Sequence, residues 1–295
     1  MYHKYAILQI DSSASKGEQF LFTKKMSSKI FNQTFQTVIC NDTEFLIVNI
    51  PFCIKNINKE KNIKRFSVSL VQILQNIGIK MIFMSKSVKN IPILERSILQ
   101  SFEICTGKKV IQYFQKKIVK KYLANQTDNT QQYHIVIIAD KVEQTHQFIE
   151  EICQNVQTIE IVAEREDDFI NLTENIFFEY GFMVPCRSRI TPFIEKGKLY
   201  INLSGNTDFI MEEINKNGLE ILDISKEHQT NKYFYQQFIF YLKDVFYPVV
   251  KYLQPFDQCA LEYLVRVLYN NFNEKVLDEF VKEYNVRVLK IKKND

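Results

Sequence analysis

Apolar and polar residues alternate in blocks along residues 133–223, and these blocks predict strands and helices in regular succession. Continuous apolar runs such as Ile135 to Ile138 indicate strands buried on both faces of a sheet. Short strands separated by helices of about a dozen residues are typical of βαβ units and a parallel sheet. We predict strands at 133–139, 158–163, 182–186, 198–203 and 219–223, and helices at 142–155, 167–180 and 207–217.

The first third of the chain has a mixed pattern. Two hairpin-like strand pairs, 6–10 with 19–23 and 35–40 with 45–50, precede a helix near 65–77 and a strand at 80–84. A helix often ends on a residue with a left-handed backbone, which glycine adopts without strain. The glycines that follow an apolar-periodic helix and precede a short β-rich run are Gly78, Gly181 and Gly218.

The remaining segments suggest how the chain is divided. An apolar stripe with a 3.6-residue period predicts a helix over 107–122, and the polar run 124–132 reads as a linker. Beyond residue 229 the pattern is helical and aromatic, except for a closing alternation at 286–291 that is typical of an edge strand. The predicted regions are an N-terminal α/β domain (1–106), a linking helix and linker (107–131), a Rossmann-like domain (132–226) and C-terminal helices packing between or across the domains (227–295).

These patterns place the chain in the α/β class. The fold we predict is an N-terminal mixed α/β domain, a Rossmann-like doubly wound parallel sheet and a C-terminal helical segment. Its 295 residues are enough for two modest domains, each with its own core.

Composition excludes few functions. With 38 basic and 34 acidic residues the chain is close to neutral, which does not favour nucleic acid as a partner. The six cysteines stand singly, and none is at zinc-site spacing with the four histidines, so we expect no metal site. Their apolar surroundings predict reduced, buried thiols and a cytoplasmic protein. No uninterrupted apolar run is long enough to predict a signal peptide or a membrane span.

Two surfaces are candidates for partner binding. The linking helix carries a lysine-rich face that is a solvated surface, a site for nucleic acid or a site for anionic membrane. Ten aromatic residues lie between Tyr233 and Phe256, a segment expected to be helical. It is either buried between the domains or a surface for a homo-oligomer or another protein partner. The lysines of the linking helix are Lys108, Lys109, Lys116, Lys117, Lys120 and Lys121.

The first βα turn of the Rossmann-like region lacks glycine. Its sequence, Asp140-Lys141-Val142-Glu143-Gln144, offers side chains where a dinucleotide fold usually brings bare backbone close to a pyrophosphate. Asp140 and Glu143 would also place negative charge beside the phosphates. We therefore expect that no dinucleotide binds there in the usual pose.

Other residues at strand ends are candidate ligand-binding positions. Glu164 lies 24 residues after Asp140, near the spacing of an acidic residue that binds a ribose hydroxyl, although it also suits a solvated charge before an acidic helix start. Ser204-Gly205-Asn206 forms either a binding loop or a helix cap. Arg187 and Arg189 either bind a phosphate or carboxylate or are solvated.

The segment Leu199-Tyr200-Ile201-Asn202-Leu203-Ser204 resembles a strand end that lies beside the nicotinamide in two-domain oxidoreductases of the shikimate dehydrogenase and glutamyl-tRNA reductase type. The segment from Val48 to Lys55 is also similar to a motif of that family whose lysine works as acid or base, but here Lys55 sits two residues later and a threonine is absent. The resemblance implies an N-terminal α/β domain, a linking helix, a Rossmann-like domain and C-terminal helices.

Three functions remain open at this stage. The first is a non-catalytic or regulatory, self-associating protein that has lost the nucleotide loop and has no cofactor. The alternative is an NAD(P)-dependent oxidoreductase of the shikimate dehydrogenase type, with NAD or NADP bound by an atypical loop. A nucleic-acid-associated protein using the lysine-rich helix is a further alternative. The pattern of residues identifies no catalytic group, since the histidines form no constellation and the carboxylates no spaced pair.

Overall fold

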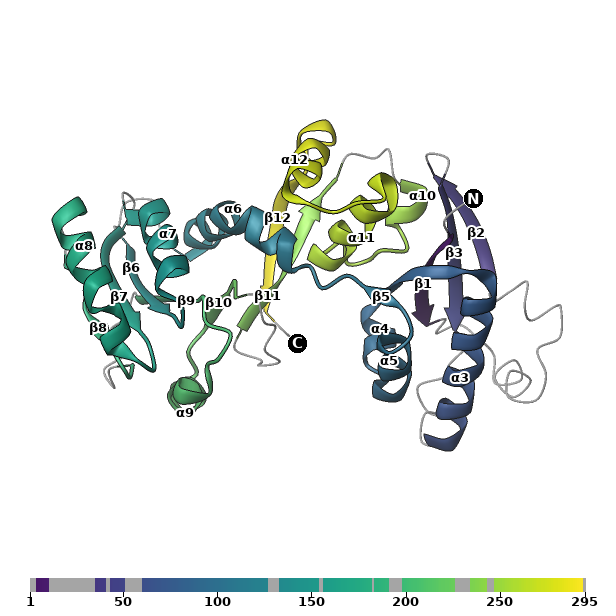
Figure 1. The fold of residues 1–295 in the computed structure, drawn as a ribbon, viewed down its shortest axis with the longest axis horizontal. Coiled ribbons are helices and arrows are strands. Elements are labelled where there is room, and N and C mark those ends of the chain that lie inside the picture. The colour runs from purple at the N-terminus through teal and green to yellow at the C-terminus, as the bar shows by residue number, and fades with distance from the viewer. Residues whose placement is uncertain are drawn as a thin grey trace. The chain divides into compact units, whose positions relative to one another are not determined.

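The structure is a computed structural model in which two compact units can be distinguished. The first comprises residues 1–107 and 240–287, and the second comprises residues 108–239 and 288–295. Both units are of the α/β type (Figure 1). The residues that the structure describes are 4–10, 35–40, 43–50, 60–126, 133–153, 156–181, 183–190, 198–225, 234–242 and 247–293.

A five-stranded sheet with the order β2-β3-β1-β4-β5 forms the first unit. β2 and β3 are antiparallel, which confirms the predicted hairpin, whereas β1 runs parallel to both β3 and β4. β3 and β4 flank β1 on its two sides, so the predicted pairing of 6–10 with 19–23 is wrong. Residues 19–23 themselves lie outside the described residues. The strands are β1 (Lys4–Ile10), β2 (Phe35–Cys40), β3 (Thr43–Ile50), β4 (Ile79–Met84) and β5 (Glu103–Ile104).

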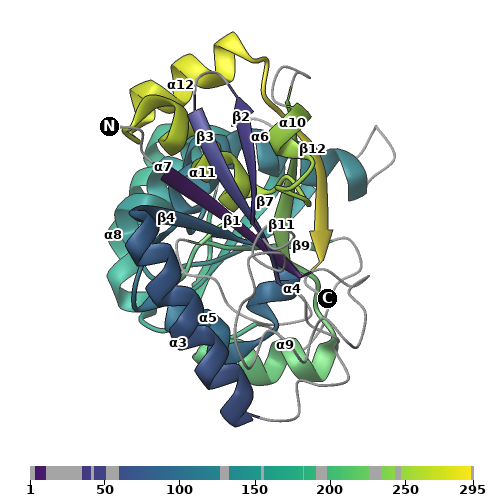
Figure 2. The same cartoon turned by 90° about the vertical axis from the view of Figure 1, so that its right-hand side faces the viewer.

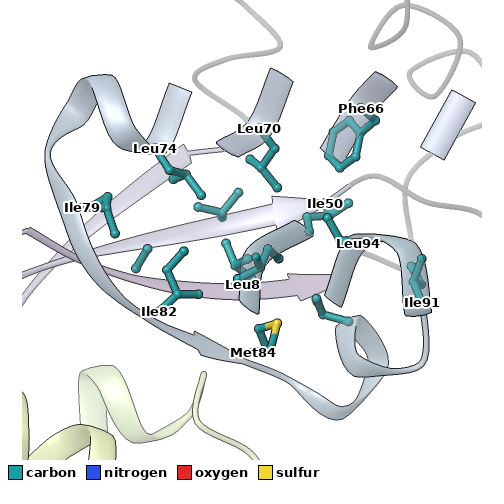
Figure 3. Close-up of a cluster of buried hydrophobic side chains, with 14 of the residues drawn as sticks. Leu8, Ile50, Phe66, Leu70, Leu74, Ile79, Ile82, Met84, Ile91 and Leu94 are labelled. Carbon is teal, nitrogen blue, oxygen red and sulfur yellow. The ribbon is translucent and has the colours of Figure 1, made fainter. Parts of the chain in front are cut away.

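Helices pack against this sheet. Figure 2 faces the unit, with β1, β3 and β4 side by side and α3 lying along them. The apolar stripe of α3 packs on the sheet, where Leu70 and Leu74 reach toward Leu8 and Ile82 (Figure 3). The helices among the described residues of this unit are α3 (Glu60–Ile77), α4 (Lys86–Lys89), α5 (Pro92–Leu99), α10 (Tyr247–Val250), α11 (Gln258–Tyr269) and α12 (Glu274–Glu283).

The C-terminal part of the chain completes this unit. Tyr263 of α11 is fully buried, its ring lies 5.8 Å from that of Phe83 and 6.4 Å from that of Phe45, and its hydroxyl donates to the Ala6 carbonyl. Side chains alternate between the two faces of a strand, so Phe83 points away from its neighbour Ile82, which packs under α3. Both faces of this sheet are therefore covered by helices.

The second unit is built on a seven-stranded sheet with the order β12-β11-β10-β9-β6-β7-β8. The pairs from β8 through β11 are all parallel. Numbered from β6, these six strands have the order 3-2-1-4-5-6, which is that of the doubly wound Rossmann fold. The strands are β6 (Tyr133–Ile138), β7 (Val156–Val162), β8 (Cys186–Arg187), β9 (Lys198–Asn202), β10 (Ile221–Asp223), β11 (Phe234–Tyr241) and β12 (Arg287–Lys293).

Helices connect the parallel strands of this second sheet. Right-handed crossovers that leave β6 in opposite directions place their helices on opposite faces. One face of the sheet, with Val136 and Ile138, packs against Ile210 and Ile214 of the β9–β10 connection. The helical segments are α6 (Lys108–Gln126), α7 (Val142–Ile152), α8 (Ile170–Tyr180), α9 (Met211–Asn217) and the short 3-10 turns η3 (Glu166–Phe169) and η4 (Asp208–Ile210).

Most of the predicted elements are confirmed, including the left-handed backbone at Gly78, Gly181 and Gly218. The predicted bounds 182–186 of the third strand are wrong, since β8 covers only Cys186–Arg187.

The prediction of a helical aromatic segment from Tyr233 is wrong over Phe234–Tyr241, which forms β11. There Phe238 and Phe240 are buried and the residue between them is only partly so, a two-residue alternation of strand type. Aromatic residues favour strands, so their density is not a helical signal.

Gly107, at the end of the first unit's N-terminal segment, is held by a close contact. Its N–H donates to the buried Glu262 carboxylate at 2.6 Å, and its φ is +73°. A Cβ atom on Gly107 would lie 2.3 Å from Cγ of Gln258. The chain can therefore pass α11 only where there is no side chain.

We predict that Gly107→Ala lowers the free energy of unfolding by about 3 kcal/mol, because a left-handed backbone costs an alanine roughly 1–2 kcal/mol and overpacking adds about 1–3. Gly78→Ala is the matched control. It has φ +85° but open space around the new Cβ, so only the first cost applies. Urea unfolding measures both variants, and equal losses would contradict the role of the contact with Gln258.

Candidate functional site

The carboxyl edge of the second sheet gathers most of the predicted site residues. β6 is flanked by β7 on one side and β9 on the other, and it runs parallel to both. The segments that follow these strands, 139–141, 163–165 and 203–207, therefore meet at one edge. In open α/β sheets this reversal of strand order is where ligands bind.

The turn after β6 is bound to the turn after β9. Oδ2 of Asp140 accepts a hydrogen bond from the Gly205 N–H at 3.0 Å. The Asp140 carboxylate thus spans the two segments where the strand order reverses, and it does not cap α7. Lys141 is the N-cap residue of α7, and its side chain makes no capping hydrogen bond. The first turn of α7 is therefore open to an outside acceptor in the described part of the chain.

The three residues of the predicted binding loop mainly bond to one another. The Ser204 hydroxyl donates to the Asn206 carbonyl and accepts from the Asn206 N–H. Oδ1 of Asn206 accepts from the Asp208 N–H at 3.1 Å, at the start of η4. This is the capping arrangement that the sequence left open. Within it, Gly205 and Asn206 stay partly or fully exposed, while Ser204 is buried.

A buried polar pair under this loop was not predicted. Asn202, the last residue of β9, is fully buried, and its Nδ2 donates to Oδ1 of Asp223 at 3.0 Å and to the Ser204 carbonyl. Its Oδ1 accepts from the Ser204 N–H, and Asp223 also accepts from the Ser225 N–H. The two strand ends are thereby fixed to one another. The signal in the sequence was an Asn and an Asp at the ends of apolar runs.

Glu164 and Arg165 follow β7 at the same edge and are exposed. Within the described ranges, the Glu164 side chain makes no hydrogen bond or ion pair. Its place after the second strand of the Rossmann order is that of an acidic residue that binds ribose. Ribose binding by Glu164 stays a prediction.

The two arginines predicted to bind anions have different surroundings. Nε of Arg187 lies 3.5 Å from Oε1 of the buried Glu160, whose other oxygen is 3.0 Å from Nζ of Lys198. An anion at Arg187 would compete with that carboxylate. Arg189 lies beyond the end of β8 and is exposed. Arg189 is thus the more accessible of the two.

The remaining predicted surfaces are placed as follows. The six lysines of α6 are all exposed, and Nζ of Lys117 lies 5.2 Å from the centre of the Phe114 ring. In the aromatic segment, Phe238 and Phe240 are buried within the chain and are not available to a partner. Self-association and nucleic-acid binding stay predictions. No helix in the described ranges is both long and apolar enough to cross a membrane.

Three of the cysteine thiols are poor nucleophiles. Burial raises the pKa of Cys259 to about 12, and burial together with Glu166 raises the pKa of Cys186 to about 11. Cys105 is buried beside Glu262, and its pKa is raised as well. A thiol reacts as its thiolate, so these three residues are protonated and inert at neutral pH.

Comparisons with known proteins gave matches among solved structures alone. No protein-family model and no curated protein matches the chain. A shikimate dehydrogenase in complex with NADP+ is 11% identical over 76% of this chain and 77% of that chain, with a TM-score of 0.29. Shikimate dehydrogenase 1 from Peptoclostridium difficile is 11% identical over 95% and 97%, with a TM-score of 0.24. A 5-ketofructose reductase of a Gluconobacter species is 8% identical over 96% and 99%, with a TM-score of 0.28. At such TM-scores the fold assignment comes from the strand order alone.

We predict that Asn202→Ala destabilises the protein by about 2 kcal/mol, because the buried Asp223 carboxyl group loses a donor and the Ser204 N–H loses an acceptor. Asn206→Ala is the matched control on the same loop. It removes only an exposed cap, which typically costs about 1 kcal/mol. Urea unfolding compares the two, and a larger loss at Asn206 would show that the buried pair does not hold the edge together.

Proposed function

We propose that the chain is an NAD(P)-dependent oxidoreductase of two-domain dehydrogenase type, with its cofactor across the carboxyl edge of the second sheet. The observation that carries the proposal is the 3-2-1-4-5-6 strand order, with α7 starting at the point of reversal and lacking a side-chain cap. In this fold, that helix start is where a dinucleotide places its phosphates.

The start of α7 suits a phosphate. The N–H groups in the first turn of a helix have no partner within the helix, and the helix dipole makes that end positive. Lys141, exposed at the N-cap, adds a cation there. Glu164 would accept from a ribose hydroxyl, and the neighbouring Arg165 would favour the additional phosphate of NADP.

The turn after β6 fits the cofactor less well. Asp140 and Glu143 are both exposed carboxylates, and no glycine lets the backbone approach a pyrophosphate closely. Glu164 and Lys141 would therefore hold the ribose and one phosphate, whereas the turn after β6 does not suit a full pyrophosphate. The nicotinamide ring, when bound, would supply hydride transfer. Among this chain's own residues, Asn202 fixes the carboxyl end of β9 by its hydrogen bond to Asp223. The family resemblance implies that this strand end would help to position the ring.

No proton donor is assigned within the described ranges. The lysine that the family resemblance suggests, Lys55, lies outside them.

A second candidate is the non-catalytic or regulatory role. It is favoured by the hydrogen bond between Asp140 and Gly205, which links the two turns that a dinucleotide would separate. In a protein that binds no cofactor, such a hydrogen bond would hold the turns after β6 and β9 together. The two candidates make opposite predictions about cofactor binding.

We predict that NAD or NADP binds the chain with a Kd below 1 mM and that Glu164→Gln weakens binding. Asp140→Asn keeps an acceptor for Gly205 but removes a charge near the phosphates, so affinity should rise about fivefold. Two charges about 4 Å apart in water interact by about 1 kcal/mol. Isothermal titration calorimetry measures all three proteins.

Glu151→Gln is the control, since it removes one exposed carboxylate near the far end of α7. Its affinity should equal that of the unchanged protein. If neither the unchanged protein nor Asp140→Asn binds NAD or NADP at millimolar concentration, the oxidoreductase proposal is wrong and the non-catalytic role stands.

A further inference from the structure

Helices α7 and α8 bring a histidine and two glutamates together on the surface of the second unit. His146 and Glu150 are four residues apart on α7, and Glu179 is near the end of α8. Nε2 of His146 lies 3.8 Å from Oε1 of Glu150 and 3.8 Å from Oε2 of Glu179. The three donor atoms all lie within 4.8 Å of one another.

The imidazole of His146 lacks a hydrogen-bond partner at the centre of this cluster. Nε2 of His146 is itself shielded from solvent and has no hydrogen-bond partner in the described part of the chain. A shielded polar atom without a hydrogen-bond partner is energetically unfavourable. Two carboxylate oxygens face it at a distance too long for hydrogen bonds. An ion placed between the three donors would satisfy all of them.

We propose that His146, Glu150 and Glu179 bind a divalent transition-metal ion, with zinc the best fit. Zinc takes nitrogen at about 2.0–2.1 Å and carboxylate oxygen at about 2.0–2.2 Å, so neighbouring donors in a tetrahedral site lie about 3.4 Å apart. Nε2 of His146 is about 0.4 Å farther from each carboxylate oxygen than in that geometry, and the two carboxylate oxygens lie within 4.8 Å of one another. An imidazole ligand favours zinc, copper or nickel over calcium and magnesium, which prefer oxygen.

A neighbouring tyrosine supports one of the ligands. The Tyr180 hydroxyl donates to Oε1 of Glu150 at 3.3 Å, the same oxygen that faces His146. Hydrogen bonds to a ligand from outside the metal site orient it and commonly change metal affinity 10–100-fold. With three protein ligands the fourth position is left for water.

The site would be separate from the proposed cofactor edge and independent of it. α8 ends at Tyr180, before the chain enters β8 at its amino end, whereas the cofactor is proposed at the carboxyl ends. A metal there ties α7 to α8, which cover the same face by the crossover rule. Its role is to fix the two helices together, and the open fourth position lets a ligand reach the ion.

The experiment titrates zinc into chelator-treated full-length protein by calorimetry. We expect one saturable site, weakened at least tenfold by His146→Ala and by the near-isosteric Glu179→Gln. His134→Ala and Glu151→Gln are matched controls. His134 lies in β6 with its Nδ1 2.8 Å from Oγ1 of Thr158, and Glu151 is exposed on α7. Neither control should change the affinity.

Cobalt(II) gives a second readout that does not depend on affinity. A site made of one imidazole and two carboxylates should show the visible bands of a low-coordinate ion without the near-ultraviolet thiolate band that a cysteine ligand produces. The proposal is overturned by a thiolate band, by equal binding to the unchanged protein and His146→Ala, or by the absence of saturable binding at 1 mM zinc. Circular dichroism confirms that Glu179→Gln is folded.

Discussion

The second unit depends on one constraint, which is that the strands from β8 to β11 run parallel. A parallel neighbour can be reached only by crossing back over a face of the sheet, so every such connection needs a helix or a long segment. All strands then end at the same edge, and the segments after them meet there. This brings Asp140 to Gly205, which is 65 positions away in the chain. The same constraint requires apolar runs in the strands, because both faces are covered.

The sequence was informative wherever a signal is local. The helix ends at Gly181 and Gly218, and the order of strands and helices between residues 133 and 223, follow from periodicity within a few turns of chain. What it could not predict were partners distant in the chain. Asn202 meets Asp223 only because β9 and β10 are neighbours in the sheet. The aromatic run in β11 was misread because aromatic density was counted and its two-residue alternation was not.

The candidate site shows the same division between local and distant information. Reading along the chain correctly identified a glycine-free turn at Asp140 and the positions of Glu164 and Ser204 after their strands. It assumed that the Asp140 carboxylate would face the start of α7, where phosphates bind. In the structure the carboxylate turns to Gly205, and the helix start is left without a side-chain cap. A side-chain direction of this kind depends on a neighbouring strand and is absent from any local pattern. The same holds for His146, whose nearest carboxylates come from two helices.

The hydrogen bond between Asp140 and Gly205 is weak compared with the binding free energy of a cofactor. A hydrogen bond to a charged group contributes about 1.5–3 kcal/mol at most, and less where water can replace it, as at this exposed position. A ligand with micromolar affinity gains about 8 kcal/mol on binding. Breaking this bond would therefore weaken a cofactor by roughly tenfold to a hundredfold, and it would not abolish binding. The stronger obstacle is the volume of the side chains in the turn, because a clash with a pyrophosphate is relieved only by moving the backbone or the ligand. The function of this edge thus depends mainly on whether a dinucleotide can bind without a clash with the side chains of the turn after β6. It depends much less on whether the hydrogen bond between Asp140 and Gly205 breaks.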